Sequence, residues 1–247
     1  MKRVKGVFLS DLHMPDHVNL NPVIKYIKDL KPDLIILGGD IIDAKGMHGV
    51  ESFKVTDFKK EWYRRDVKLL KDFLIKLHKA VPKASYIYLE GNHEERYTRL
   101  MRKYGDTFAG DFNFMRDAIP RGLKIKWIPY GTYDSFYKLG DTIFLHGNLY
   151  PDLHAKKYAL DYSPFKCVYG HLHHYQSYTT RSSLAAREPH YAVTAGCLCS
   201  TAPEWKKGAP NQWINGFTSF VCEGGKVMPQ VHLIENGTFY VGGKEYR

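Results

Sequence analysis

Three short apolar runs in the first 92 residues are each followed at once by acidic, imidazole or amide side chains. The runs VKGVFLS, PDLIILGGD and ASYIYLEGN read as buried strands, and segments with helical spacing of apolar residues separate them at 21–31 and 53–81. Strands that alternate with helices predict a parallel sheet with crossover helices. Because the carboxyl ends of parallel strands meet at one edge of a sheet, the polar residues that follow them are expected to converge.

The second half of the chain has a different pattern. From Lys124 onward, shorter strands alternate with glycine-containing turns, among them EGGK and ENGT, which are typical of antiparallel hairpins. No linker, internal repeat or low-complexity segment interrupts the sequence. We therefore expect one domain over 1–247, in which two sheets pack face to face with helices outside.

The charge balance is basic. The chain carries 36 Lys plus Arg against 26 Asp plus Glu, a formal net charge of +10 with a pI near 9.2. Such a balance favours polyanionic partners such as nucleic acid, but surplus lysine on solvated faces would give the same count. The sequence leaves both interpretations open.

Neither the cysteines nor the N-terminus indicates an exported or membrane protein. The four cysteines have no zinc-knuckle spacing, and Cys197-Leu-Cys199 is better explained by buried thiols on one face of a strand. The opening MKRVKGVFLSDLH has too few apolar residues for a signal peptide, and no segment approaches the ~18 apolar residues of a membrane span. We expect a reduced, cytoplasmic protein without a membrane partner; its oligomeric state is open.

Five short motifs carry most of the chemistry. They are Asp11-Leu-His13, Gly39-Asp40-Ile-Ile-Asp43, Gly91-Asn92-His93-Glu94, His146-Gly147-Asn148 and Gly170-His171-Leu-His173. Each comes at or just after a predicted strand end. Their mixture of imidazole and oxygen ligands suits Mn, Fe or Zn better than Mg or Ca alone. Any one motif can occur by chance, but all five in this order indicate a metal site.

In that order the motifs resemble those of the calcineurin-like metallophosphoesterases, whose pattern is D-x-H, G-D-x-x-D, G-N-H-[DE], a later H, and G-H-x-H. The match runs from residue 11 to residue 173. The resemblance implies a four-layer α/β/β/α sandwich of two mixed β-sheets flanked by helices. It also implies two divalent metal ions, with Mn foremost and Fe, Zn, Co or Ni as other candidates.

The resemblance also assigns roles to individual residues. It gives the first metal to Asp11, His13 and His173, the second to Asn92, His146 and His171, and a bridging position to Asp40. His93 would contact the phosphate and protonate the leaving oxygen without binding metal. One departure is Asn148, which stands where many members of the family carry a further histidine.

The implied reaction is hydrolysis of phosphodiesters, in nucleic acid or nucleotides, by two-metal activation of a bridging hydroxide. The alternatives are a phosphomonoesterase acting on nucleotides or phosphoproteins, and a metal-binding scaffold without activity. Candidate substrate contacts are Arg96, His48 and Asn148, although an exposed helical arginine is the commoner role for Arg96. The tryptophan-rich loop at 201–217 is expected to set specificity. Glu94 is expected to favour the start of a helix or to orient His93.

Overall fold

The computed structural model describes residues 3–47, 57–108, 113–181 and 189–247. The helices are α1 (Asn21–Leu30), η1 (Lys45–Met47), α2 (Asp57–Ala80), α3 (Glu95–Phe108), α4 (Phe114–Ala118), α5 (His154–Asp161) and η3 (Glu204–Lys206). The first six strands are β1 (Val4–Leu9), β2 (Leu34–Leu37), β3 (Ser85–Leu89), β4 (Ile125–Ile128), β5 (Phe136–Leu139) and β6 (Thr142–Leu145). The strands that follow are β7 (Lys166–Tyr169), β8 (Tyr175–Thr180), β9 (His190–Ala195), β10 (Gly216–Glu223), β11 (Lys226–Leu233), β12 (Phe239–Val241) and β13 (Lys244–Tyr246).

The first sheet contains the predicted parallel strands. Its order is β11-β10-β1-β2-β3-β4, with β1 to β4 parallel and β10 and β11 antiparallel at one side. The predicted hairpin turn EGGK joins β10 to β11, where Gly224 and Gly225 take positive φ values that only glycine adopts freely. The prediction of a parallel sheet from the first half is therefore confirmed.

The second sheet is mixed, so the expectation of antiparallel hairpins in the second half is confirmed only in part: β5 and β6, and β8 and β9, pair antiparallel, but two other pairs do not. Its order is β5-β6-β7-β9-β8, and β6, β7 and β9 run parallel. Helix α5 connects β6 to β7 and supplies the crossover that a parallel pair requires. The apolar residues of this short helix alternate with polar ones too irregularly for its sequence alone to indicate it.

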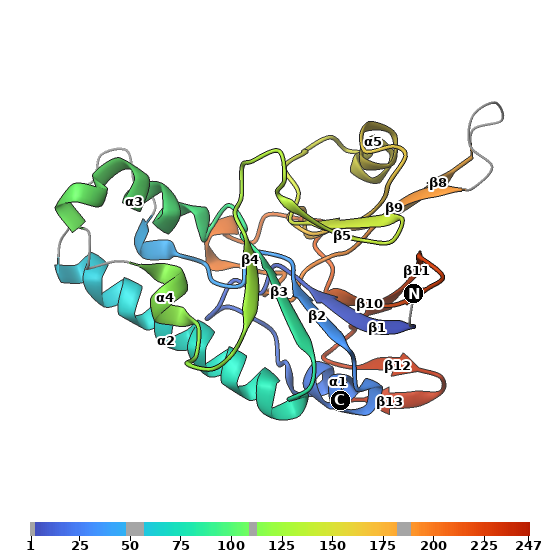
Figure 1. Cartoon of the computed structure of the whole chain (residues 1–247), viewed down its shortest axis with the longest axis horizontal. Coiled ribbons are helices and arrows are strands. Elements are labelled where there is room, and N and C mark those ends of the chain that lie inside the picture. The colour runs from blue at the N-terminus through green and yellow to red at the C-terminus, as the bar shows by residue number, and fades with distance from the viewer. Residues whose placement is uncertain (1–2, 48–56, 109–112, 182–188) are drawn as a thin grey trace.

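Three separate apolar cores show that the protein has four layers. One core lies between the first sheet and α1 and α2, a second between the two sheets, and a third between the second sheet and α5. Figure 1 shows the same succession, with α1 and α2 below the first sheet and α5 above the second. The predicted α/β/β/α sandwich of two mixed sheets is confirmed. None of the helices in the described ranges combines the length and apolar content needed to cross a bilayer.

The core between the sheets depends on aromatic rings from both. Phe144 of β6 is fully buried, and its ring centroid lies 4.8 Å from that of Phe220 in β10 and 6.0 Å from that of Phe8 in β1.

We expect Phe144→Ala to lower the free energy of unfolding by about 3–5 kcal/mol, because it leaves a cavity between the sheets. Urea denaturation measures this. The control Met228→Ala removes a side chain that is 54% exposed and should change stability by no more than about 0.5 kcal/mol. Equal losses in the two variants would contradict the packing described.

Candidate metal centre

The five motifs meet where strands of both sheets end. Asp11, Asp40 and Asn92 follow β1, β2 and β3, while His146 and His171 follow β6 and β7 of the other sheet. Backbone hydrogen bonds join the loops: Asp11 N–H donates to the Gly39 carbonyl (3.0 Å), and His13 N–H donates to the Asp40 carbonyl (2.9 Å). His171 N–H donates to the Asp11 carboxylate at 2.9 Å and so ties the two sheets together.

Left-handed backbone conformations are concentrated at this place. Nine described non-glycine residues have clearly positive φ, and five of them belong to the motifs: Asp11, His13, Asp40, His171 and His173, with φ between 46° and 78°. Such conformations are strained for residues with a Cβ and persist only where the surrounding structure imposes them. Here these backbone conformations orient the carboxylate and imidazole groups toward one another.

One group of side chains lies around His13 and His173. Their Nε2 atoms are 3.1 Å apart, and Asp11 Oδ1 lies 3.4 Å from His173 Nε2. Asp40 Oδ2 lies 3.7 Å from His13 Nε2. Ligand atoms of Asp11, His13 and Asp40 all fall within 4.8 Å of one another, and all three residues are buried.

A second group lies around His146. Its Nε2 is 3.3 Å from Asp40 Oδ2, 3.0 Å from Asn92 Oδ1 and 3.2 Å from His171 Nδ1. Asp40, His146 and His171 again present ligand atoms within 4.8 Å of one another. Asp40 thus belongs to both groups and lies between them.

Hydrogen-bond polarity shows that both groups fit cations. His146 Nδ1 donates to the Gly38 carbonyl (2.8 Å), so in the neutral ring Nε2 carries a lone pair. That lone pair faces the oxygens of Asn92 and Asp40, which are also acceptors. His13 is arranged in the same way, with Nδ1 directed at Asp43 Oδ1 (3.2 Å). Clustered acceptors whose outer nitrogens are fixed by carbonyl or carboxylate groups are typical of metal sites.

The pKa values show how the same groups interact when no cation is bound. Burial raises the pKa of Asp40, but the facing charges of His146, His93 and His13 hold it well below its usual value. Burial lowers the pKa of His146, but the charge and hydrogen bond of Asp40, the Asp11 charge and the Gly38 carbonyl together outweigh it and raise this pKa to about 9. Burial and the neighbouring His146 lower the pKa of His171 to about 4. Since ligands must be deprotonated to bind metal, a cation here competes with the His146 proton.

Asp43 has a structural role that the motif alone does not indicate. Its carboxylate lies 3.2 Å from His13 Nδ1 and 3.1 Å from His93 Nδ1, and its backbone carbonyl lies 2.6 Å from His93 Nδ1. Burial raises the pKa of Asp43, but its contacts with His13 and His93 hold it far below the usual range. Arg96 Nη1 donates to the same carbonyl at 2.8 Å. Asp43 therefore orients both imidazoles, and Arg96 turns inward instead of occupying an exposed helical position.

Glu94 joins the loops after β2 and β3. Its Oε1 accepts from the backbone N–H of Ile41 (2.7 Å) and Ile42 (3.2 Å) and from the Tyr88 hydroxyl (2.8 Å). Its Oε2 accepts from Asp40 N–H (2.9 Å) and Gly91 N–H (3.0 Å). This carboxylate is fully buried, and both burial and the Asp40 charge raise its pKa. From the sequence Glu94 is expected to stabilise the start of a helix, but four of its five donors are backbone groups in the loops that follow β2 and β3.

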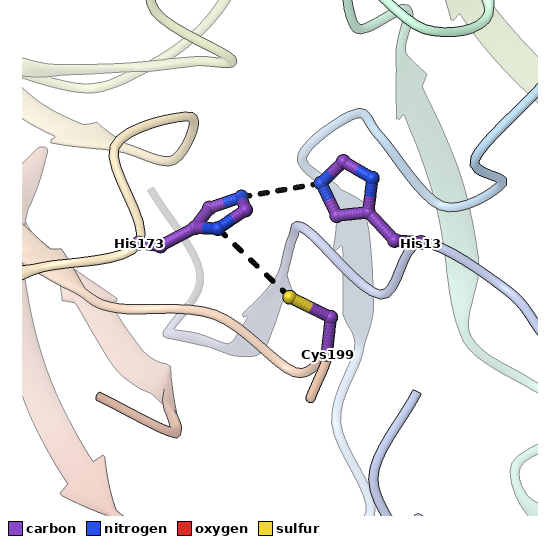
Figure 2. A group of neighbouring side chains, drawn as sticks. All are labelled: His13, His173 and Cys199. Atoms are coloured by element: carbon purple, nitrogen blue, oxygen red, sulfur yellow. Dashed lines mark hydrogen bonds between the residues drawn. The ribbon is translucent and has the colours of Figure 1, made fainter. Parts of the chain in front are cut away.

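A thiol lies behind His173. Cys199 Sγ is 3.9 Å from His173 Nδ1, on the side of the ring opposite His13 (Figure 2). All four cysteines are buried and free, as expected from the sequence. The contact makes Cys199 a neighbour of a candidate ligand, which the Cys-x-Cys spacing did not indicate.

A cavity of about 650 Å³ opens over both groups. Lys45, His93, Arg96 and Trp213 line it, and the Trp213 ring centroid is 4.2 Å from that of His173. Asn148 is exposed and lines an adjacent cavity with Tyr130 and His146. His48 and the Trp205 side chain lie outside the described residues.

Because Glu94 gathers five donors, we expect Glu94→Gln to destabilise the protein. The amide nitrogen would face N–H groups, and unsatisfied buried donors cost about 1–3 kcal/mol each. Urea denaturation in EDTA should show a loss of at least about 2 kcal/mol, and Mn²⁺ content after reconstitution should fall. Glu95→Gln is the matched control: Glu95 is the next residue and only partly buried, and its replacement should change stability by no more than about 0.5 kcal/mol. An unchanged unfolding free energy for Glu94→Gln would contradict the role described.

Known proteins provide an independent comparison. The family model described as calcineurin-like phosphoesterase matches residues 5–193. The fold is similar to Vacuolar Protein Sorting 29 from Cryptosporidium parvum, with a TM-score of 0.50, 12% identity, and 99% of this chain and 98% of that chain covered. At this identity the likeness concerns the fold alone.

Two further solved structures are similar over nearly their whole length. Wild-type Vps29 from Entamoeba histolytica complexed with Zn²⁺ is 10% identical, with 96% of each chain covered and a TM-score of 0.48. A conserved protein from Streptococcus pneumoniae TIGR4, described as a predicted phosphoesterase, is 14% identical, with 100% and 98% covered and a TM-score of 0.40. A search of curated proteins found no match. Since the family model covers most of the sequence, this chain belongs to the calcineurin-like phosphoesterase family.

Proposed function

We propose that this protein is a metal-dependent phosphoesterase that hydrolyses phosphodiesters, with nucleic acid or nucleotides as its substrate class. The observation that carries the proposal is the convergence of five strained motif residues on a buried cluster in which Asp40 belongs to two groups of ligand atoms. Strained backbone of this kind is concentrated at functional sites.

The proposed ligands divide between two divalent cations. Asp11, His13 and His173 would hold one, Asn92, His146 and His171 the other, and Asp40 would contact both. When bound, two such cations supply Lewis-acid activation of water and neutralise charge on the phosphoryl oxygens. The donor set of imidazole and oxygen is compatible with Mn, Fe, Zn, Co or Ni, and we propose Mn as the first to test.

His93 is the proposed proton donor. Its Nδ1 is held by Asp43, which leaves Nε2 at the cavity, 3.8 Å from Asp40 Oδ2. Burial lowers the pKa of His93, but the Asp40 charge and the contact with Asp43 raise it overall, a shift in the direction that a proton donor requires. That proton can pass to the leaving oxygen of an ester.

Arg96 completes this arrangement. Its Nη2 lies 3.2 Å from His93 Nε2, so it can donate to the neutral ring once the proton has left. Its guanidinium also lines the cavity with Lys45, which places two cationic side chains where an anionic ester would bind. These contacts support Arg96 as a substrate contact.

Aromatic rings on both sides support a diester with large substituents. The Trp213 ring packs against His173, and Tyr150, which is 72% exposed, has its ring centroid 4.8 Å from that of His171. A diester has two substituents, and aromatic side chains of this kind stack nucleobases. The basic net charge supports the same substrate class.

The first test compares bis(p-nitrophenyl) phosphate with p-nitrophenyl phosphate in Mn²⁺. We expect a higher kcat/KM for the diester and loss of activity in EDTA. A preference for the monoester would replace the proposal by a phosphomonoesterase. A protein that binds Mn²⁺ stoichiometrically but hydrolyses neither ester would favour a non-catalytic scaffold. Activity that survives EDTA unchanged would contradict the metal centre.

We expect His93→Ala to lower kcat by about 10²–10⁴-fold while metal content stays that of the wild type, because the removed group donates a proton and is not a ligand. The loss should be greater for a phenyl ester than for a p-nitrophenyl ester, whose leaving group needs protonation less. His190→Ala, which removes a half-buried imidazole at the start of β9, is the control and should leave both rates unchanged. Loss of metal in His93→Ala, or equal losses for the two esters, would sink the assignment.

A further inference from the structure

A cavity not described so far lies away from the metal centre, between α2 and α4. It has a volume of about 600 Å³ and is lined by five cationic side chains and one carboxylate. The cations are Lys60, Arg64, Lys71, Arg116 and Arg121. We call this cavity the basic cleft. Most of its lining residues belong to α2 and α4, which lie next to each other in Figure 1.

Residues on one face of α2 form one wall of the basic cleft. Lys60, Arg64, Val67 and Lys71 recur at intervals of three and four, so they share one face of the helix. Leu70 and Leu77, on another face, are fully buried toward the sheet. The amphipathic helix therefore directs a row of positive charges toward α4 as a consequence of burying its apolar side.

The carboxylates in the described ranges offset only part of this charge. Asp117, the one acid among the described lining residues, pairs with Arg116, whose Nε donates to it at 2.7 Å, and it accepts from the Tyr63 hydroxyl at 2.6 Å. Two acids of α2 have partners outside the basic cleft: Asp66 accepts from the Tyr97 hydroxyl at 2.7 Å, and Asp72 pairs with Lys68 at 2.6 Å. The lining thus keeps an excess of positive charge.

We propose that the basic cleft binds the phosphate backbone of a nucleic acid, as a site separate from the metal centre. This rests on the proposed function, whose substrate class it narrows to a polynucleotide. Three of the five cations are arginines, whose planar guanidinium groups match phosphate oxygens. A volume near 600 Å³ also exceeds what one phosphate ion fills, since pockets of this size take much larger ligands.

The chemistry of the lining favours a polynucleotide over an acidic protein. Protein interfaces depend on buried aromatic or aliphatic anchors. Among the described residues that line the basic cleft, Val67 and Ile119 are the only aliphatic ones, and Tyr63 is buried and already bonded to Asp117. A cationic groove with few apolar anchors is typical of backbone recognition.

Packing connects the basic cleft to the metal centre. Tyr63 lines the basic cleft, and its ring centroid lies 5.3 Å from that of Tyr97. Tyr97 directly follows Arg96, which lines the cavity over the metal centre. One ring contact between α2 and α3 thus joins a residue of the basic cleft to the chain neighbour of a residue that lines the metal-site cavity.

The test measures binding without hydrolysis. Fluorescence anisotropy of a labelled single-stranded oligonucleotide is followed in EDTA, with the full chain, between about 50 mM and about 200 mM salt. The variant Arg64→Glu/Arg121→Glu changes two lining residues that lie outside the proposed catalytic machinery. We expect it to weaken binding by at least about tenfold and to reduce the salt slope by about 1.4, since each phosphate contact on a single strand contributes about 0.7.

Two controls make the result specific. Lys25→Glu/Lys156→Glu makes the same change in net charge at exposed lysines outside the basic cleft and should weaken binding far less. Hydrolysis of bis(p-nitrophenyl) phosphate in Mn²⁺ should be the same in wild type and in Arg64→Glu/Arg121→Glu. Circular dichroism and urea denaturation establish that both variants are folded.

Three outcomes would overturn the proposal. These are equal losses of binding in the two double variants, no binding by the wild type at low salt, and displacement by polyglutamate as efficient as by unlabelled oligonucleotide. The first and third would indicate a general electrostatic field and not a phosphate site. Binding that depends on the basic cleft in a protein without diesterase activity would support this site while overturning the proposed function. The two proposals therefore fail separately.

Discussion

The candidate metal centre depends on one buried carboxylate that is not itself a candidate ligand. Glu94 accepts hydrogen bonds from backbone groups after β2 and from Gly91 after β3, so the two strand ends are held at a fixed separation. Asp40 takes a left-handed conformation within this loop, and its Oδ1 then accepts from His93 N–H at 2.9 Å. Without those donors satisfied, the strained backbone at Asp40 would relax, and the carboxylate would no longer lie between the two groups of ligand atoms.

Burying so many ionisable groups together is tolerated because they compensate one another. Isolated buried carboxylates and imidazoles would neutralise themselves, yet the pKa of Asp40 is held low and that of His146 is raised to about 9. Each shift results from attraction between the two partners that exceeds the cost of desolvation. A cluster with this property is poised to exchange protons for divalent cations, since a cation satisfies the same carboxylate without requiring a charged imidazole.

The sequence predicted the first sheet, the four layers and the convergence of the motifs because these follow from local pattern. Apolar runs of strand length, separated by helical spacing, determine which strand ends share an edge. It did not predict the parallel strands of the second sheet, because α5 is short and weakly patterned. Nor did it predict the roles of Asp43 and Glu94 or the contact between Cys199 and His173. These contacts join residues that are 26 to 54 positions apart in the sequence. A periodic pattern of apolar residues carries no information about such contacts.

The position of Arg96 and the distribution of the basic charge also depend on tertiary contacts that the sequence does not reveal. Helical position alone leaves Arg96 in solvent, but the carbonyl of Asp43 draws its guanidinium to the cavity, where it faces His93. Likewise, a net charge of +10 could be dispersed over the surface, whereas the α2–α4 packing gathers five cations around one cavity. A layer of packed rings connects these two places: the ring centroids of Tyr63 and Tyr97 are 5.3 Å apart, and Tyr97 and Phe114 are stacked with centroids 4.9 Å apart. Because close-packed rings deform little, this layer keeps both places at a fixed separation, which a substrate that contacts both of them would require.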